Sequence, residues 1–256
     1  MTAGAAAVAL AAAATAAGQA PPPAPETAPA VAPAPPAQPA PPAPEACTAR
    51  ERRPGPPPAW SRARRATVLV DSVLLGGVPQ LRQAFRGWRM SVMGRPAIML
   101  PAAEQQVRAG GRIAPLAVVG VGYNSLWERG RRNHRHWASR FDAQARALVR
   151  ALRARGARQV VWVTLREAGR AVIPSRALWQ HDAYAWYFPY VNERLRRLDD
   201  RRDDLILADW AAVSRRRGIT YDAIHLNPDG GSLMARTIRR AVDRAARAQT
   251  PPPTCR

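Results

Sequence analysis

The sequence contains no lysine. All 39 of its basic residues are arginine, and with only 18 acidic residues the formal net charge at neutral pH is +21. A charge of this size is typical of nucleic-acid-binding proteins, because cationic side chains neutralise phosphates and release counterions. Selection for phosphate contacts would accept either cation, so the complete absence of lysine indicates a coding bias towards arginine. We therefore expect no nucleic-acid partner, and we keep an Arg-rich polyanion-binding module as the rival interpretation.

Long hydrophobic segments are missing as well. After the N-terminal segment no stretch approaches the roughly 18 uncharged apolar residues that a membrane helix needs, so the sequence predicts no transmembrane segment. Residues 1–20 are rich in alanine and carry an A-x-A-like cleavage site near Ala17, but they lack a basic n-region. We expect residues 1–20 to be a signal peptide or an Ala-rich leader, which implies an extracytoplasmic or secreted protein.

Proline is scarce outside one segment. Of the 26 prolines, 16 fall between residues 21 and 58, among alanines and few other residues. Such a composition cannot bury apolar surface, so residues 21–58 are predicted to be a disordered, extended linker. Hydrophobic residues make up 47% of the chain, which is enough for a core and excludes a wholly disordered basic tail. We expect the folded domain at residues 65–248 and a C-terminal tail at residues 249–256.

Only two cysteines are present, Cys47 where the linker ends and Cys255 next to the last residue. They bracket the folded part of the chain, and the termini of compact domains often lie close together. Together with the export-like leader, this arrangement favours a disulfide formed in an oxidising compartment. Two unrelated free thiols are the alternative.

Short apolar runs alternate with segments of helical spacing in the folded part. The runs are too short for helices, and they lie at residues 68–70, 116–121, 159–165 and 205–209. Apolar residues at helical spacing predict helices at 74–85, 141–152 and 233–245. This alternation predicts an α/β fold with a five-stranded parallel sheet that helices cover on both faces. In such sheets the functional site lies at the carboxyl ends of the strands.

Three short motifs lie at these strand ends or just before the last helix. Asp71-Ser72 follows the first run, Gly122-Tyr123-Asn124 follows the run at 116–121, and Asp222 precedes His225 by three residues. Each motif has an ordinary explanation, since Asp-Ser is a common helix N-cap and Gly with Asn is turn chemistry. The order and placement of all three together are much less expected by chance.

In these residues the chain resembles the SGNH (GDSL-like) hydrolases. It is most similar to their bacterial extracytoplasmic branch, which includes the SGNH domains associated with polysaccharide acyltransferases. The similarity covers residues 67–245, and it implies a three-layer flavodoxin-like fold, ester or acyl-transfer chemistry, and no metal or organic cofactor. One position and one segment depart from the family: Val70 stands where a glycine normally precedes Asp-Ser, and residues 93–97 match the second family block poorly.

The resemblance implies a role for each matching residue. Ser72 would be the nucleophile, His225 the general base and Asp222 the group that orients the base. The oxyanion would be surrounded by two backbone N–H groups and one side-chain amide, from Ser72, Ala97 (alternate Gly94) and Asn124.

The expected function is that of a serine esterase or acyl hydrolase acting on carboxylic esters, including O-acetyl and other O-acyl esters. The alternatives are an O-acyltransferase to cell-envelope glycans, and a polyanion-binding module on a catalytically degenerate fold. We expect a small-molecule or glycan ester as substrate, and a monomeric protein. His134 and His136 lie among arginines, which is unfavourable for a bound cation, so no metal site is expected there. Trp127 is predicted to lie near the substrate, whereas the aromatic cluster at 179–190 is interpreted as packing.

Overall fold

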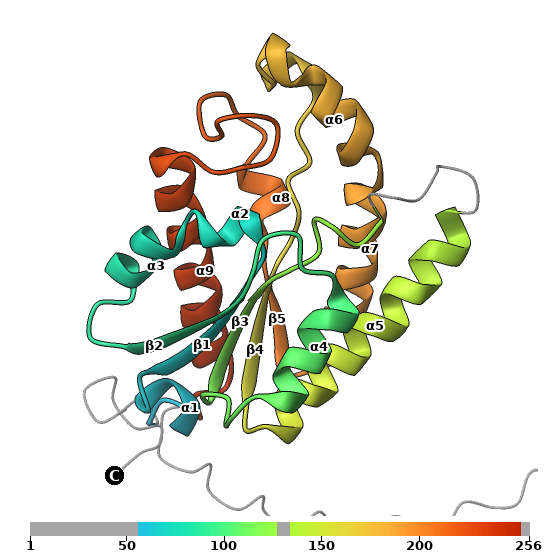
Figure 1. Ribbon diagram of the computed structural model, residues 1–256. Coiled ribbons are helices and arrows are strands. Elements are labelled where there is room, and N and C mark those ends of the chain that lie inside the picture. Colours follow the sequence, from blue (N-terminus) through green and yellow to red (C-terminus); the bar gives the residue numbers. More distant parts are fainter. Residues whose placement is uncertain (1–55, 127–133, 252–256) are drawn as a thin grey trace, which may run out of the picture. The chain divides into compact units, whose positions relative to one another are not determined.

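The computed structural model describes residues 56–126 and 134–251 of the chain (Figure 1). Backbone contacts divide the chain into two units, Met1–Ala46 and Cys47–Arg256, and every described residue belongs to the second. The expected leader, nearly all of the expected linker, both cysteines and Trp127 lie outside the described residues.

The core of the domain is one five-stranded sheet. Its strands are β1 (Arg65–Val70), β2 (Arg89–Gly94), β3 (Leu116–Gly120), β4 (Gln159–Val163) and β5 (Leu205–Ala208). All pairings are parallel, and the order across the sheet is β2-β1-β3-β4-β5. This is the flavodoxin-like order, in which the chain reverses direction across the sheet next to β1. The predicted fold class is therefore confirmed.

Nine helices of the described chain connect and cover these strands. They are α1 (Ala59–Arg62), α2 (Ser72–Leu75), α3 (Val78–Ala84), α4 (Leu100–Ala109), α5 (His134–Ala154), α6 (Leu178–Tyr184), α7 (Phe188–Asp199), α8 (Trp210–Val213) and α9 (Pro228–Ala248), with 3-10 turns at Arg170–Val172, Ser175–Ala177 and Ala185–Tyr187. Helices α3 and α9 pack together on one side of the sheet, and α4, α5 and α7 pack in a row on the other (Figure 1). The sheet is thus the middle of three layers. None of the described helices is long and apolar enough to cross a membrane.

Burial explains which strands can be located from the sequence. Strands β3 and β4 are buried at every position and β1 at all but its first, because helices cover both of their faces, and such strands read as continuous apolar runs. Strand β2 is at the edge of the sheet and only partly buried, with Arg89 and Ser91 exposed between apolar residues. It therefore produces no apolar run, and the four runs locate only the other four strands.

One expected helix is wrong in its extent. Residues 74–85 form two short helices, α2 and α3, and the chain turns between them at Gly76 and Gly77. A side-chain carbon on Gly77 would lie 3.3 Å from Cδ1 of Leu226 and 3.6 Å from Cα of Gly231, so this turn passes close to α9. Pro79 then stands in the first turn of α3, where its missing N–H is not needed. The break allows α2 to end above the sheet while α3 packs on α9.

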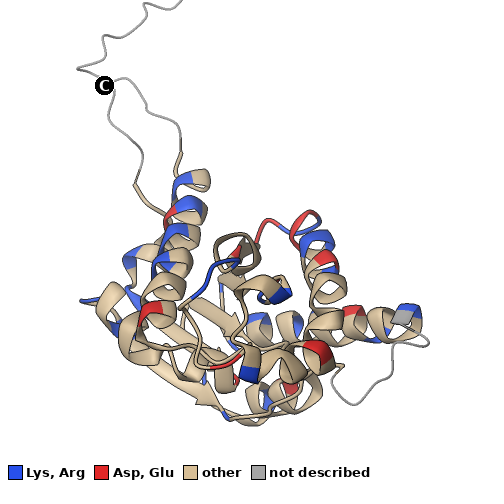
Figure 2. Cartoon of the chain, turned by 90° about the horizontal axis from the view of Figure 1, so that it is seen from above, with Lys and Arg blue, Asp and Glu red and all other residues tan. Residues whose placement is uncertain are grey.

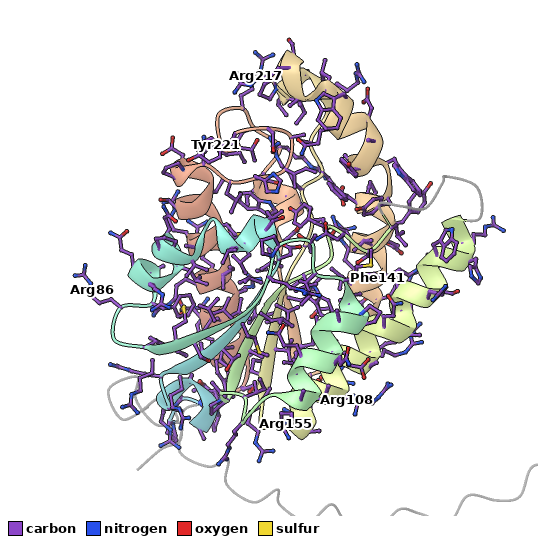
Figure 3. The ribbon with its side chains drawn as sticks, viewed as in Figure 1. Arg86, Arg108, Phe141, Arg155, Arg217 and Tyr221 are labelled. Carbon is purple, nitrogen blue, oxygen red and sulfur yellow. The ribbon has the colours of Figure 1, made fainter. Side chains whose placement is uncertain are left out.

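Figure 2 shows arginine positions distributed along helices on both sides of the sheet. Figure 3 shows Arg86, Arg108 and Arg155 at the periphery, whereas Phe141 lies between α5 and the sheet and is buried. Several arginines pair with carboxylates one helical turn away, as Arg108 does with Glu104. The charge is thus spread over solvated helix faces.

Candidate active site

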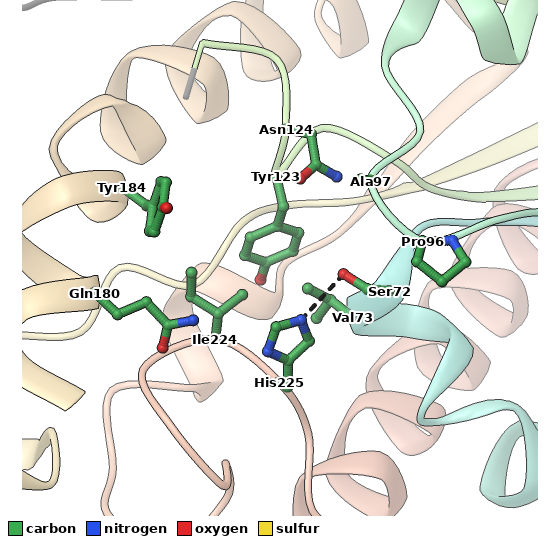
Figure 4. A pocket seen from close by; sticks show the side chains of 10 residues that line it. All are labelled: Ser72, Val73, Pro96, Ala97, Tyr123, Asn124, Gln180, Tyr184, Ile224 and His225. Atoms are coloured by element: carbon green, nitrogen blue, oxygen red, sulfur yellow. Dashed lines mark hydrogen bonds between the residues drawn. The ribbon is translucent and has the colours of Figure 1, made fainter. Parts of the chain in front are cut away.

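A pocket of about 350 Å³ opens at the carboxyl ends of β1 and β3 (Figure 4). Ten residues line it, namely Ser72, Val73, Pro96, Ala97, Tyr123, Asn124, Gln180, Tyr184, Ile224 and His225. They come from segments that follow β1, β2 and β3, from α6, and from the loop before α9. Parallel α/β sheets place their ligand sites at this edge.

The structure brings Ser72, His225 and Asp222 into one hydrogen-bonded chain. Nε2 of His225 is 3.1 Å from Oγ of Ser72, and Nδ1 of His225 is 2.7 Å from Oδ2 of Asp222. The other carboxylate oxygen of Asp222 accepts the backbone N–H groups of Ile224 and His225, at 2.7 and 2.6 Å. The spacing of three residues thus lets one carboxylate cap its own turn and also hold the imidazole.

Hydrogen bonds and charge set the protonation of this pair. Burial of the Asp222 carboxyl raises its pKa, but hydrogen bonds from the His225 side chain and from two backbone N–H groups outweigh burial, and the pKa falls well below its usual range. The hydrogen bond to Asp222 raises the pKa of His225 above its ordinary value of 6.5, although burial opposes the rise. Asp222 is therefore a carboxylate at neutral pH, and it stabilises the charged form of His225.

Ser72 owes its position to Asp71. Asp71 is the N-cap of α2, and its Oδ1 accepts the N–H groups of Val73 and Leu74 at 3.0 and 3.5 Å. The N-cap interpretation of Asp-Ser is therefore confirmed, and the same cap leaves the Ser72 hydroxyl facing His225. Below this turn, a side-chain carbon on Gly120 would lie only 2.3 Å from Leu74, so glycine in β3 allows α2 to approach the sheet.

Burial also affects Asp71 itself. Its side chain is fully buried, and burial raises its pKa to about 7, although the N–H groups of Val73 and Leu74 lower it. One of its carboxyl oxygens, Oδ2, has no hydrogen-bond partner among the described residues. Asp71 is thus a structural carboxyl that takes up a proton near neutral pH.

Two of the predicted oxyanion donors beside Ser72 line the same pocket. The amide nitrogen of Asn124 is buried without a partner in the described chain, and in Figure 4 it lies on the side of Ala97 and Ser72. Ala97 has a φ of 56°, in the left-handed region, and a 3.4 Å hydrogen bond from Ile98 N–H to the Arg95 carbonyl closes the turn around it. Proline followed by a residue of positive φ is the pattern of a type II turn, which explains Pro96 at this point.

Gly94, the alternate donor, does not line the pocket. It pairs with Val70 across β1 and β2, and a side-chain carbon at Gly94 would lie 2.0 Å from the Val70 carbonyl oxygen. Close backbone approach at the end of β1 therefore depends on Gly94 of the neighbouring strand. Val70, at the position where the sequence resemblance leads us to expect glycine, is fully buried at the end of β1.

Arg166 is a site residue that the motifs did not identify. Its side chain is only 2% exposed and donates hydrogen bonds of 2.9 to 3.1 Å to four oxygens of one loop: Ser214 O, Arg216 O, Thr220 Oγ1 and Ala223 O. Among the described residues no carboxylate lies within ion-pair distance of it. The available signal was an arginine directly after the apolar run at 159–165.

The aromatic cluster at 179–190 divides between two roles. Tyr187 and Phe188 are buried in the core, as the packing interpretation expects, while Tyr184 lines the pocket and Trp179 is 66% exposed. The Tyr187 hydroxyl donates a hydrogen bond to the backbone carbonyl of Tyr123. The side-chain hydroxyl of Tyr123 accepts the backbone N–H of Arg166 at 2.8 Å.

His136 contacts the ring of Trp137, and the described residues hold no cluster of three metal-ligating side chains.

No protein-family profile and no curated protein sequence matches the chain. Solved structures do match. The C-terminal catalytic domain of peptidoglycan O-acetyltransferase A from Streptococcus pneumoniae, with a methylsulfonyl adduct, aligns over 75% of this chain and 97% of its own, at a TM-score of 0.50 and 16% identity. A GDSL-like lipase from Bacteroides thetaiotaomicron aligns over 72% of this chain and 90% of its own, at a TM-score of 0.54 and 14% identity. An acetyl xylan esterase aligns over 69% of this chain and 99% of its own, at a TM-score of 0.52 and 15% identity. At sequence identities this low, these structural matches show only that the fold is shared.

Proposed function

From the SGNH/GDSL hydrolase fold of this chain, we propose that the protein is a serine esterase or acyl hydrolase that acts on carboxylic esters. The observation that carries the proposal is the hydrogen-bonded chain from Ser72 through His225 to Asp222 in the wall of the pocket. Nucleophile, base and orienting group are the parts that acyl transfer requires, and they meet at the strand ends.

In the acylation step, Oγ of Ser72 bonds to the carbonyl carbon of the ester. Nε2 of His225 takes the hydroxyl proton, and the resulting imidazolium is stabilised by Asp222. The carbonyl oxygen, now an oxyanion, faces the N–H groups of Ser72 and Ala97 and the Asn124 amide. Collapse of this intermediate breaks the bond to the alcohol oxygen, which leaves with the proton from His225.

In the second step, water attacks the acylated Ser72. His225 removes a proton from the water and returns it to Oγ of Ser72, which releases the carboxylic acid. The His225 side chain is 41% exposed, so water reaches this base. The overall reaction consumes one ester and one water, and it yields one acid and one alcohol.

Transfer of the acyl group to a glycan hydroxyl is the second candidate. Structural similarity to a peptidoglycan O-acetyltransferase domain favours it, because an acceptor alcohol would take the place of water in the same second step. The two reactions differ only in the acceptor. Product analysis with and without added saccharide separates them.

The test compares hydrolysis of 4-nitrophenyl acetate by the wild type, Ser72→Ala and Ser139→Ala. Ser139 lies exposed on α5 and supplies a matched control. We expect Ser72→Ala to lose about 1,000-fold or more in kcat and Ser139→Ala to keep wild-type activity. Phenylmethylsulfonyl fluoride should modify the peptide that contains Ser72. Equal rates for Ser72→Ala and the wild type would refute the proposal.

A further inference from the structure

Gln180 presents hydrogen-bond donors to the pocket from the side of α6. Its side-chain oxygen accepts the backbone N–H of Ala223 at 3.3 Å. Because an N–H group can only donate, this contact fixes which end of the amide faces the loop. The amide nitrogen of Gln180 is therefore the end left for the pocket, as Figure 4 shows.

These donors have no acceptor within the described chain. Among the described residues, Oε1 accepts the one hydrogen bond of the Gln180 side chain, and Nε2 has no acceptor. A donor that no protein group satisfies needs water or a ligand oxygen, since removing it from both is costly. Tyr184 lies one helical turn further along α6 and lines the same wall.

The proposed reaction determines which part of the substrate lies against this wall of the pocket. In Figure 4, Asn124 and Ala97 lie above Ser72, whereas Gln180 and Tyr184 lie to the left of it, beyond His225 and Ile224. The carbonyl oxygen must face Asn124 and Ala97, and the alcohol oxygen must face His225 to receive its proton. The rest of the alcohol then extends towards Gln180 and Tyr184.

We propose that Gln180 and Tyr184 form the subsite for the alcohol part of the ester, and that this alcohol is a sugar. A sugar carries acceptor oxygens for Nε2 of Gln180 and a flat, weakly polar ring face for the Tyr184 ring. A hydrocarbon alcohol would displace water from the Gln180 amide and leave its donors unpaired. This inference rests on the proposed esterase function and specifies its substrate class.

The experiment compares two acetate esters, 6-O-acetylglucose and 4-nitrophenyl acetate, with wild type, Gln180→Glu and Gln105→Glu. Glutamate at position 180 keeps an oxygen for the Ala223 N–H, but it replaces the donors in the pocket by an acceptor. Gln105 is exposed on α4, so the same substitution there is a matched control. Any effect of the new charge on His225 is common to both esters and cancels in the ratio of their kcat/KM values.

We expect Gln180→Glu to lower kcat/KM for the sugar ester about tenfold more than for the aryl ester, mainly through KM. Gln105→Glu should leave both values unchanged. Equal losses on both esters would overturn the inference, because Gln180 would then act only through the loop. A wild type that prefers octyl acetate to the sugar ester would overturn it as well.

Binding separates failure of the subsite from failure of the esterase. If the wild type turns over no ester, the proposed function fails, and the subsite is tested by titrating 6-O-acetylglucose into Ser72→Ala by NMR. Weaker binding in Ser72→Ala with Gln180→Glu than in Ser72→Ala alone would support the subsite. Absence of saturable binding to Ser72→Ala would overturn it.

Discussion

At the scale of single residues, two carboxyl groups of the site experience opposite environments. Asp222 accepts three hydrogen bonds and stays ionised, because these bonds outweigh its burial. Asp71 is fully buried, one of its oxygens has no partner in the described part of the chain, and its pKa rises to about 7. The two environments thus keep Asp222 charged beside the imidazole of His225, whereas they favour the protonated form of Asp71 at the helix N-cap.

The first prediction concerns Asp222→Asn. Because Asp222 raises the pKa of His225, and the base must be neutral, we expect wild-type kcat/KM to rise with pH through a pKa above 6.5. In Asp222→Asn this rise should move to lower pH, and the plateau should fall about 1,000-fold or more. Rates on 4-nitrophenyl acetate from pH 4 to 9 measure both, with Asp243→Asn on α9 as the control. An unmoved rise in Asp222→Asn would contradict the assignment.

The second prediction concerns Asp71 and stability. The folded protein holds this proton up to about pH 7, whereas an unfolded aspartic acid loses it near its ordinary value of 3.8. The contribution of Asp71 is therefore fully present below that value and is lost as pH rises to about 7. Asp71→Asn keeps the capping oxygen and removes the titration.

Urea unfolding of wild type and Asp71→Asn from pH 4 to 8 measures this contribution. The free energy of unfolding of the wild type, minus that of the variant, should decrease across this range. If the difference between the two free energies of unfolding stayed constant, Asp71 would not titrate between pH 4 and pH 8. Asp243→Asn again serves as the control, because Asp243 is paired with Arg239 on the surface of α9.

At the scale of structural elements, one buried side chain makes four hydrogen bonds to the loop between α8 and α9. The loop contains no helix or regular strand, only an isolated bridge between Thr220 and Leu226. Arg166 donates hydrogen bonds to four oxygens of this loop, and one of them is Oγ1 of Thr220. The Thr220 hydroxyl in turn donates to the backbone carbonyl of Asp222 at 2.5 Å. Arg166 is therefore a positioning residue that acts through the loop carrying Asp222 and His225.

The third prediction follows for Arg166→Ala. Four loop oxygens would lose their donor, so we expect the free energy of unfolding to fall by about 3 kcal/mol. For the molecules that remain folded, kcat should fall about tenfold or more with little change in KM, because His225 is less well placed. Millimolar guanidinium should restore part of kcat in Arg166→Ala but not in Ser72→Ala. A loss of stability with normal kcat and no rescue would mean a structural role alone.

The same elements show how far the sequence predicts the structure. Strands covered on both faces read as apolar runs, so β1, β3, β4 and β5 could be located, whereas the half-exposed β2 could not. The residues of the three motifs meet because each follows a strand end or precedes α9. Arg166 and Gln180 contact loop residues 43 to 57 positions away, and no local pattern reports such contacts.

At the scale of the whole molecule, the two ends of the described chain meet at one end of the sheet. The indole N–H of Trp60 in α1 donates to the side-chain oxygen of Gln249 at 2.7 Å, across 189 residues of sequence. The amide nitrogen of Gln249 donates in turn to Gln159 at the start of β4, at 2.7 Å. This junction lies at the opposite end of the sheet from α2 (Figure 1).

The last prediction concerns the two cysteines, which lie outside the described residues. Cys47 precedes Trp60 by 13 positions and Cys255 follows Gln249 by 6, and six extended residues reach about 20 Å. Because Trp60 and Gln249 are hydrogen-bonded, both cysteines are within chain reach of a common point, and we predict a disulfide between them. It would close a loop of about 200 residues and stabilise the protein by about 5 kcal/mol in the chain-entropy account.

Peptide mapping of the non-reduced protein by mass spectrometry should find the two cysteine peptides linked, and Cys47→Ser should abolish the link. Because the junction lies far from the pocket, Cys47→Ser should lower the melting temperature without changing KM for 4-nitrophenyl acetate. Two thiols that alkylate fully without reductant, in protein purified from an oxidising compartment, would rule the disulfide out. The hydrogen bonds of Gln249 would then be the connection that holds the two ends of the domain together.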